Sequence, residues 1–375
     1  MSKNEFFKSR MEQSYVKSHI VKEYFHVWAK ILGSPSLGQS KLRYIDLFCG
    51  PGRYEEDDSA STPLLVLDNI IRDPKLCGRV DVHFNDENTD FITQLKNEIE
   101  TSTSYKDILS CISFSNFSVE NIAAPQATGR YGYPPTLLFM DPWGYKGVNT
   151  ALFKYLNYFG SEVIVFFNYN RVNMALSNPV MEKNMQKLFE EKRLLKLKAD
   201  LGGKKPKDRE IAILAAFEDV IRSKCNDPVL TMPYRFVDKD GSKTLHYLIH
   251  ITTHPLGYGR MKEIMYRYAN LQEDGIGTFD FHKANEKPQQ MYLAFSNPLD
   301  ELVGMLSTEF KGKKIKMKEI YYKHNVGKSY VEKNYKDALL KMERNGTIKV
   351  EPPIFKRRKH KGHPTMGDEC IITFL

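Results

Sequence analysis

Residues 44–52 read Tyr44-Ile45-Asp46-Leu47-Phe48-Cys49-Gly50-Pro51-Gly52, an apolar strand that runs directly into a glycine-rich turn. Glycine lets the backbone turn sharply and lets a ligand approach without a side chain between them. No Gly-Lys-Ser/Thr follows, so the turn is not a phosphate-binding Walker A loop. A strand that ends in such a turn is typical of the first βα unit of a doubly wound sheet.

Short apolar strands alternate with helical stretches around this turn. An amphipathic helix is predicted over 15–32, where apolar residues recur at helical spacing. We expect strands at 42–48, 80–85, 108–114, 136–140 and 162–168, and a hairpin of 234–237 with 245–252. A segment rich in Lys, Leu, Met and Glu between them, 171–227, predicts a helical insertion. The pattern predicts an α/β fold, a class I methyltransferase-like Rossmann sheet with an antiparallel last pair.

The turn itself indicates a site for S-adenosylmethionine, because Asp-x-Phe-x-Gly-x-Gly after a strand is moderately specific for that cofactor. Asp46 lies at the end of the strand, where its carboxylate would accept a hydrogen bond from the cofactor's amino group. Phe48, Gly50 and Gly52 would form the turn against which the cofactor binds.

The next two strand ends offer further cofactor contacts. Asp86 and Glu87 follow the second strand, where a carboxylate holds the hydroxyls of a bound ribose. We favour Asp86 because it comes first; the alternative is that it caps the following helix. Asn116 and Ser118 follow the third strand at the place of adenine contacts, or are turn residues that bind local backbone.

The fourth strand ends in Asp141-Pro142-Trp143-Gly144-Tyr145, which is the candidate reactive site. In amino-methyltransferases the corresponding acid or amide and the proline carbonyl accept both hydrogens of an exocyclic NH2. Asp141 and Pro142 would take these roles, and Trp143 or Tyr145 would stack on a flipped base. The usual motif is Asp-Pro-Pro-aromatic, so Trp143 and Gly144 put methylation of a base nitrogen in more doubt than methyl transfer. A turn after a strand is the plain structural alternative.

Two further segments have open interpretations. Residues 166–171, at the end of the fifth strand, would add stacking beside the substrate or belong to the core. Residues 254–259 either rim the pocket or make a turn. None of the five cysteines follows a proline, which excludes the Pro-Cys nucleophile of a carbon-5 cytosine methyltransferase.

The C-terminal part is strongly basic. Residues 311–361 hold 17 Lys and Arg against 5 Asp and Glu, a net charge of +12, whereas the whole chain carries +9. We predict helices at 315–323 and 330–343 and strands at 347–350 and 369–374 that flank a basic loop, which together make a winged helix. This module would bind DNA or RNA phosphates, unless the charges form a merely solvated face. The expected nucleic-acid-binding residues are Lys311, Lys313, Lys314, Lys356, Arg357, Arg358 and Lys359.

These elements define three expected regions: a helical segment at 1–40, a Rossmann domain at 41–297 with its insertion at about 171–230, and a winged helix at 298–375. The five cysteines include no Cys-x-x-Cys pair, so we expect no metal site and no disulfide framework. The N-terminus lacks the pattern of a secretory signal, and no apolar run reaches the roughly 20 residues of a membrane span. We therefore expect a cytoplasmic protein.

The whole pattern resembles the three-Cys-motif partner family, TcmP. The likeness rests on the 46–52 turn, on Asp141-Pro142-Trp143-Gly144, on 247–257, on Met261-Lys262-Glu263-Ile264-Met265 and on the C-terminal helix-turn-helix. It implies a Rossmann methyltransferase-like fold and a separate partner protein that carries the three cysteines. It implies no substrate.

Two readings of function follow. In the first, the chain is an S-adenosylmethionine-dependent methyltransferase acting on nucleic acid, at an exocyclic amine of a base. In the second, it is a catalytically inactive protein of the same fold that binds nucleic acid or a partner. The intact turn and Asp141 favour the first, and Trp143 and Gly144 favour the second. Methylation of a protein or small molecule is a third option.

Overall fold

The computed structural model describes residues 3–34, 41–54, 57–142, 147–238, 241, 243–269, 279–281 and 298–375 of the 375-residue chain. It separates into two compact units, Met1–Tyr258 and Gly259–Leu375. The helix α8 (Pro255–Tyr268) begins in the first unit and ends in the second. The boundary expected after residue 297 stays a prediction, because 282–297 lie outside the described residues.

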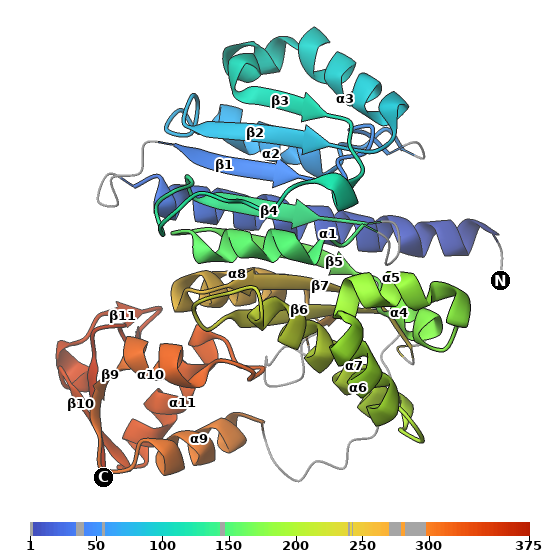
Figure 1. Cartoon of the computed structure of the whole chain (residues 1–375). Helices are drawn as coiled ribbons and strands as arrows, with labels where there is room; N and C mark the ends of the chain where they lie inside the picture. Colours follow the sequence, from blue (N-terminus) through green and yellow to red (C-terminus); the bar gives the residue numbers. More distant parts are fainter. Residues whose placement is uncertain are drawn as a thin grey trace. The chain divides into compact units, whose positions relative to one another are not determined.

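Seven described strands form the sheet of the first unit, in the order β3-β2-β1-β4-β5-β7-β6 (Figure 1). They are β1 (Leu42–Asp46), β2 (Val80–Asn85), β3 (Ile112–Ser115), β4 (Thr136–Met140), β5 (Glu162–Phe167), β6 (Leu230–Val237) and β7 (Thr244–Thr252). Strands β1 to β5 are parallel, and β7 is antiparallel to both β5 and β6. The strand order reverses between β1 and β4, and such a switch point is where open α/β sheets bind ligands.

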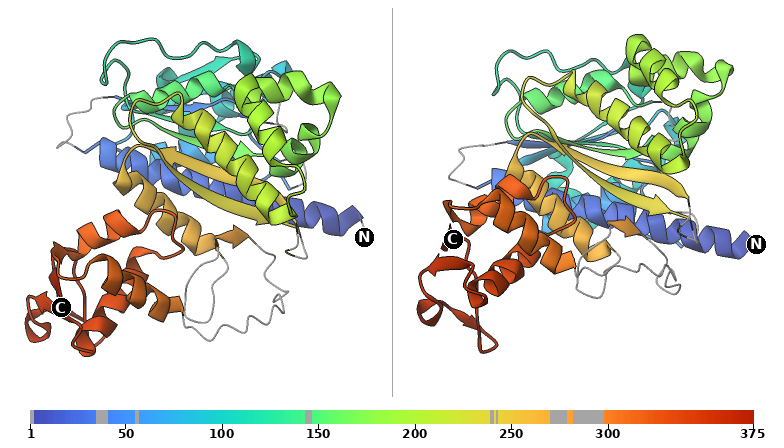
Figure 2. Two further views of the ribbon diagram at one scale, coloured as in Figure 1. Left: turned by 60° about the horizontal axis from the view of Figure 1, so that its bottom comes forward. Right: turned by 90° about the horizontal axis from the view of Figure 1, so that it is seen from below.

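Helices cover both faces of this sheet (Figures 1 and 2). On one face α1 (Lys3–Leu32) packs its Phe25 ring edge-on against Tyr44 of β1, with the ring centroids 5.4 Å apart. The neighbouring Ile45 points to the other face, into a core that α4 to α7 complete. The remaining helices of this unit are α2 (Thr62–Arg72), α3 (Thr89–Thr101), η2 (Thr103–Cys111), η3 (Val119–Asn121), η4 (Thr150–Asn157), α4 (Tyr169–Leu176), η5 (Pro179–Met181), α5 (Glu182–Phe189), α6 (Glu191–Asp200) and α7 (Pro206–Arg222).

The second unit is a winged helix. Its elements are α9 (Pro298–Glu309), β9 (Lys314–Lys316), α10 (Met317–His324), α11 (Glu332–Arg344), β10 (Ile348–Glu351), η6 (Ile354–Lys356), β11 (Lys359–His360), β12 (His363–Pro364) and β13 (Ile371–Phe374). The short strand β8 (Asp280–Phe281) precedes them in the chain and belongs to neither of their sheets. Strand β13 lies between β10 and β9 and is antiparallel to both. The hairpin of β11 and β12 is the tip of the wing.

The structure confirms the predicted fold class: a Rossmann sheet with an antiparallel last pair, a helical insertion between β5 and β6, and a C-terminal winged helix. The strand expected over 108–114 is wrong in its first half, because Ser102 accepts from the Ser104 N–H and starts the helix η2. The helix expected from 315 begins at Met317, since Ile315 pairs with β13. Helix α9 was not predicted, although its Leu302 and Leu306 fill the core of the winged helix.

No described helix is both long enough and apolar enough to cross a membrane. Among the described residues, no group of three or more His, Cys, Asp or Glu side chains is placed to hold a metal ion.

Candidate functional site

The glycine turn after β1 has a backbone that requires glycine. The φ angles of Gly50 and Gly52 are +65° and +95°. A Cβ added to Gly50 would meet no atom within 4 Å, so this backbone faces open space. A Cβ added to Gly52 would lie 2.8 Å from Cδ1 of Leu95 in α3. The turn therefore offers bare backbone at its first glycine and a close helix contact at its second.

Alanine at each glycine should separate these two roles. We expect Gly52→Ala to lower the free energy of unfolding by about 2–3 kcal/mol, because its φ is strained for alanine and its methyl group meets the buried Leu95. Gly50→Ala should cost only about 1 kcal/mol, but its methyl group fills the space beside the turn and should weaken binding of the S-adenosylmethionine that the sequence predicts there. Urea unfolding and titration calorimetry measure the two effects. Equal losses of stability would contradict this assignment.

Asp46 ends β1 beneath this turn and is 1% exposed. Its Oδ1 accepts from the Phe48 N–H at 3.2 Å, and its Oδ2 has only a long 3.5 Å contact from the Tyr44 hydroxyl. Burial raises the pKa of Asp46 to about 8, and the nearby Asp141 and Asp86 carboxylates act in the same direction. Once ionised, this buried carboxylate can accept a strong hydrogen bond from a cationic amino group.

Asp86 connects the tip of β2 to the glycine turn. Its Oδ2 accepts from the Gly50 N–H at 3.0 Å, and its Oδ1 accepts from the Asn88 N–H at 2.9 Å. Asn88 is the residue that caps α3, so Asp86 does not have the capping role considered as an alternative. Glu87 is exposed. Of the two candidate ribose ligands, only Asp86 touches the turn that would hold the cofactor.

An asparagine that the sequence interpretation missed ties three strand tips together. The buried Asn85 amide donates to the carbonyls of Leu47 and Phe117 at 3.1 and 3.0 Å, and its Oδ1 accepts from Ser115 at 2.7 Å. Asn116 makes similar local contacts, since its Nδ2 donates to the Asp86 carbonyl at 2.7 Å. Ser118 is the residue before η3, and its side chain makes no cap hydrogen bond there.

Asp141 follows β4, the strand next to β1, whose register pairs Asp46 with Phe139, two residues before Asp141. The charge of Asp141 helps to raise the pKa of Asp46, so the two carboxylates lie near each other. Its carboxylate forms an ion pair with Lys17 of α1, whose ammonium also lies 4.7 Å from the ring centroid of Phe166 in β5. Burial disfavours the charged amine, but Asp141, Tyr54 and Asp46 outweigh it and raise the pKa of Lys17. The structure thus brings Asp46, Asp141, Phe166 and the unpredicted Lys17 together. Pro142 is buried, and Trp143 and Tyr145 lie outside the described residues.

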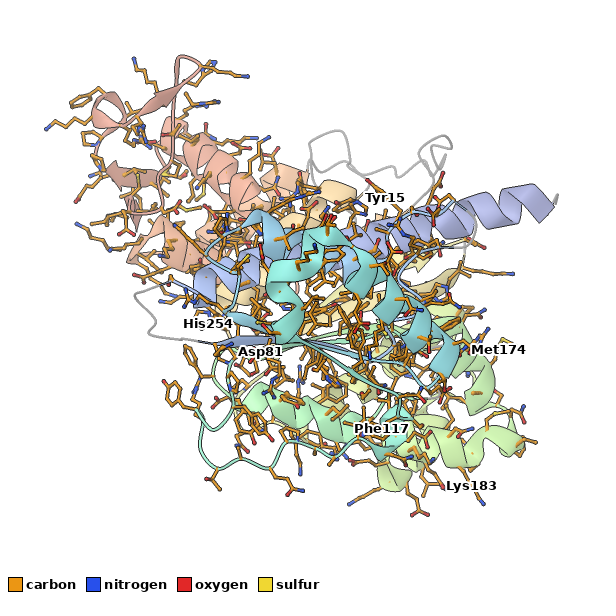
Figure 3. All side chains as sticks on the ribbon, turned by 90° about the horizontal axis from the view of Figure 1, so that it is seen from above. Tyr15, Asp81, Phe117, Met174, Lys183 and His254 are labelled. Atoms are coloured by element: carbon orange, nitrogen blue, oxygen red, sulfur yellow. The ribbon has the colours of Figure 1, made fainter. Side chains whose placement is uncertain are left out.

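Figure 3 labels side chains at the two opposite ends of the sheet. The exposed Phe117 and Met174, which follow β3 and β5, lie at the end where the parallel strands finish. His254 lies at the opposite end, because β7 is antiparallel and Ile251 pairs with Val163 at the start of β5. The 254–259 segment therefore does not rim the candidate site, and instead of a turn it forms the start of helix α8.

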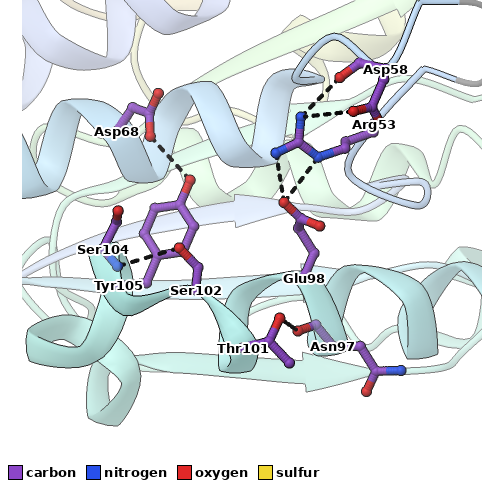
Figure 4. A network of polar contacts seen from close by, with 9 residues as sticks. All are labelled: Arg53, Asp58, Asp68, Asn97, Glu98, Thr101, Ser102, Ser104 and Tyr105. Atoms are coloured by element: carbon purple, nitrogen blue, oxygen red, sulfur yellow. Dashed lines mark hydrogen bonds and ion pairs between the residues drawn. The ribbon is translucent and has the colours of Figure 1, made fainter.

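The chain that leaves the glycine turn is held by the network in Figure 4. Arg53 donates to Glu98 of α3 through Nη2 at 2.7 Å and to the Asp58 carbonyl through Nη1 at 2.8 Å. The Gly52 carbonyl accepts from the Ser61 N–H at 2.8 Å, directly before α2. These bonds fix the turn between two helices, so its open face is held in place.

A cavity of about 390 Å³ lies elsewhere, on the face of the sheet that Ile45 and Leu47 share. Its polar lining includes Arg43, His83 and Ser113 from β1, β2 and β3. It includes neither Asp46 nor Asp141. Its location therefore does not bear on the candidate site at the strand ends.

The wing carries the other candidate site. Lys356, Arg358 and Lys359 are exposed, and none of them forms an ion pair with a described residue. Arg357 is different: it is 8% exposed and its Nη2 binds both carboxylate oxygens of Glu343 at 2.5 Å. We correct its expected role, since a buried and paired guanidinium holds the wing on α11 and does not face a phosphate.

The other expected contacts lie at the start of the module. Lys311, Lys313 and Lys314 are exposed. Lys314 forms an exposed ion pair with Glu351 at 3.1 Å, and Lys313 donates to the Glu309 carbonyl at 2.9 Å. Such exposed contacts are weak, so both lysines remain accessible to a phosphate.

Comparison with known proteins adds to this picture. A family model described as a GMT-like wHTH domain matches residues 280–354. No curated protein matches the chain. Solved structures with similarity include protein LPL1258 from Legionella pneumophila, at 9% identity and a TM-score of 0.36 over 65% of this chain and 88% of that one.

Two other solved structures are methyltransferases. The methyltransferase domain of bacterial CtHen1 is 15% identical with a TM-score of 0.29, over 63% of this chain and 100% of that one. The plantazolicin methyltransferase BamL, solved with a substrate analogue and SAH, is 12% identical with a TM-score of 0.30, over 67% and 90%. These likenesses are too distant to carry a function to this chain.

Proposed function

We propose that this protein is an S-adenosylmethionine-dependent methyltransferase that acts on nucleic acid. The observation that carries the proposal is the meeting of Asp46 and Asp141 at the switch point of the sheet, beside a glycine turn whose backbone faces open space. One carboxyl group is suited to the cofactor and the other to the methyl acceptor. Both project from strand ends, which hold them rigidly.

The residues present fit the cofactor. Asp46 is buried with one weakly bonded oxygen, which suits a cationic amino group. Gly50 leaves room at its α-carbon, and Asp86 is tied to the same turn, where its remaining lone pairs would accept from ribose hydroxyls. Bound there, S-adenosylmethionine supplies an electrophilic methyl group. Asn116 and Ser118 as adenine contacts, and Trp143 and Tyr145 as stacking residues, complete the proposal.

The test combines binding with transfer. Titration calorimetry of the full chain with S-adenosylmethionine should give a dissociation constant in the micromolar range. The labelled methyl group should then pass to total RNA or DNA and not to protein. Binding without any transfer would leave the inactive alternative, and no binding would end the proposal.

The winged helix supplies the nucleic-acid contact in this proposal. We expect the affinity for nucleic acid to fall steeply with salt, and the triple change of Lys356, Arg358 and Lys359 to alanine to reduce the slope of log K against log salt by about 3. A control that changes the exposed Lys75, Lys96 and Lys106 to alanine alters the total charge equally. Fluorescence anisotropy with a labelled duplex at several salt concentrations measures both. An equal effect of the two triples would count against the wing.

One observation favours the second candidate, a catalytically inactive protein of the same fold that binds nucleic acid or a partner. The carboxylate of Asp141 is already bound by Lys17, so an acceptor amine would have to compete with an ammonium group for it. The separate three-Cys-motif partner that the TcmP resemblance implies stays a prediction. The cytoplasmic location does as well.

A further inference from the structure

Lys17 is placed as a functional residue and not as a surface lysine. It lies in the middle of α1, on the helix face that carries the buried Val21, Tyr24 and Trp28. Its side chain is only 12% exposed, and its ammonium lies between the Asp141 carboxylate and the Phe166 ring. Helix α1 therefore brings a positive charge to the place proposed for the methyl acceptor.

The sign of this charge discriminates between acceptors. An exocyclic amine that attacks a methyl group becomes more positive, and a fixed ammonium beside it would raise the barrier. A ring N–H next to a keto oxygen, as in guanine, hypoxanthine or uracil, gives up its proton, and the negative charge spreads onto that oxygen. A neighbouring ammonium stabilises this charge, and a carboxylate beside it can take the proton.

We infer that Lys17 and Asp141 act as a pair on the edge of a keto base, so that the methylated atom is a ring nitrogen and not an exocyclic amine. This inference rests on the proposed function. Asp141 accepts the N–H proton, and the Lys17 ammonium donates to the keto oxygen. As the new N–CH3 bond forms, the S–CH3 bond breaks and its electron pair stays on sulfur. The proton later leaves Asp141 for water.

Matched polymers test the inference on the full chain. The bases of poly(I) carry a keto oxygen and a ring N–H where those of poly(A) carry an exocyclic amine and a ring nitrogen without a hydrogen. The bases of poly(U) and poly(C) differ in the same way. We expect labelled methyl groups in poly(I) or poly(U), and the product released by nuclease digestion should carry the methyl group on the ring nitrogen. Label in poly(A) or poly(C), or on ribose, would overturn the inference while leaving the proposed function intact. Failure of the protein to bind S-adenosylmethionine, or to label any nucleic acid, would overturn both.

Lys17→Met provides a readout that does not depend on turnover. This variant keeps the length of the side chain and removes its charge, so transfer to poly(I) should fall by on the order of 100-fold or more. Calorimetry well above pH 8, where Asp46 is ionised, should show S-adenosylmethionine binding that is unchanged or tighter, because a positive charge near the sulfonium has been removed. The preference for poly(I) over poly(A) in anisotropy should also disappear. A merely structural role predicts loss of cofactor binding together with transfer, and that result would contradict the inference.

Discussion

Asp46→Asn should abolish most cofactor binding and at the same time make the protein more stable. The amide keeps the acceptor for the Phe48 N–H but cannot carry the charge that would bind a cationic amino group. Loss of a charge-assisted hydrogen bond of about 1.5–3 kcal/mol weakens binding by roughly 10- to 100-fold. Titration calorimetry of wild type and variant measures this loss. Equal cofactor binding by the two proteins would contradict the site.

The gain in stability follows from the pKa of Asp46, which is raised to about 8 by burial and by the neighbouring carboxylates. In the unfolded chain the same group titrates near 4. The folded state therefore holds a proton that the unfolded state has lost between about pH 4 and pH 8, and wild-type stability falls across that range. Asp46→Asn removes this penalty, which reaches at most about 5 kcal/mol above pH 8.

Thermal unfolding at two pH values separates this effect from an unrelated change in packing. The melting temperature of Asp46→Asn should exceed that of wild type more at pH 8 than at pH 5, since the penalty is largely absent at the lower pH. A gain of the same size at both pH values would show that ionisation of Asp46 is not its cause. The same titration predicts that wild-type cofactor affinity rises with pH up to about 8, because only the ionised carboxylate attracts the cation.

The fold could be predicted well where the signal is local. The glycine turn and the apolar runs of β2 and β4 depend on neighbouring residues, and their predicted positions match the structure closely. The hairpin of β6 and β7 was also predicted, but β6 begins at Leu230, four residues before its predicted start. The strand prediction was wrong over 108–111, where the mixed apolar and polar residues fit a short helix as readily as a strand, and it was correct over 112–114. Helix α9 was missed although Leu302, Leu306 and Phe310 recur at helical spacing.

The candidate site was predicted only in part, because it combines strand ends with a residue of α1 that lies far from them in the sequence. Asp46 and Asp141 were found because strand ends are recognisable one at a time. Lys17 was not, since it lies 124 residues from its partner in the chain. A signal was present: Lys17 precedes Val21 by one helical turn, so a lysine interrupts the apolar stripe of an otherwise amphipathic helix. A charge on a buried stripe indicates a partner that sequence spacing does not identify.

Asp141→Ala should stop methyl transfer, by about 1000-fold or more, and leave cofactor binding intact. The carboxylate would contact the acceptor and not the cofactor. Asp141→Ala should therefore lose methyl transfer and keep cofactor binding, whereas Asp46→Asn should lose cofactor binding itself. Single-turnover transfer to nucleic acid and calorimetry with S-adenosylmethionine measure them. The variant also leaves the largely buried Lys17 without its carboxylate, which by itself lowers stability.

The double variant Lys17→Met, Asp141→Ala removes both charges and is the control for that complication. It should recover the stability lost in Asp141→Ala without recovering transfer. Asp141→Asn then decides what the carboxylate does. If it only orients an exocyclic amine, the amide oxygen still accepts the hydrogen bond and part of the activity survives. If it takes a proton from a ring nitrogen, the amide cannot, and Asp141→Asn should be as inactive as Asp141→Ala. Wild-type transfer in Asp141→Ala would show that the tip of β4 takes no part in the reaction.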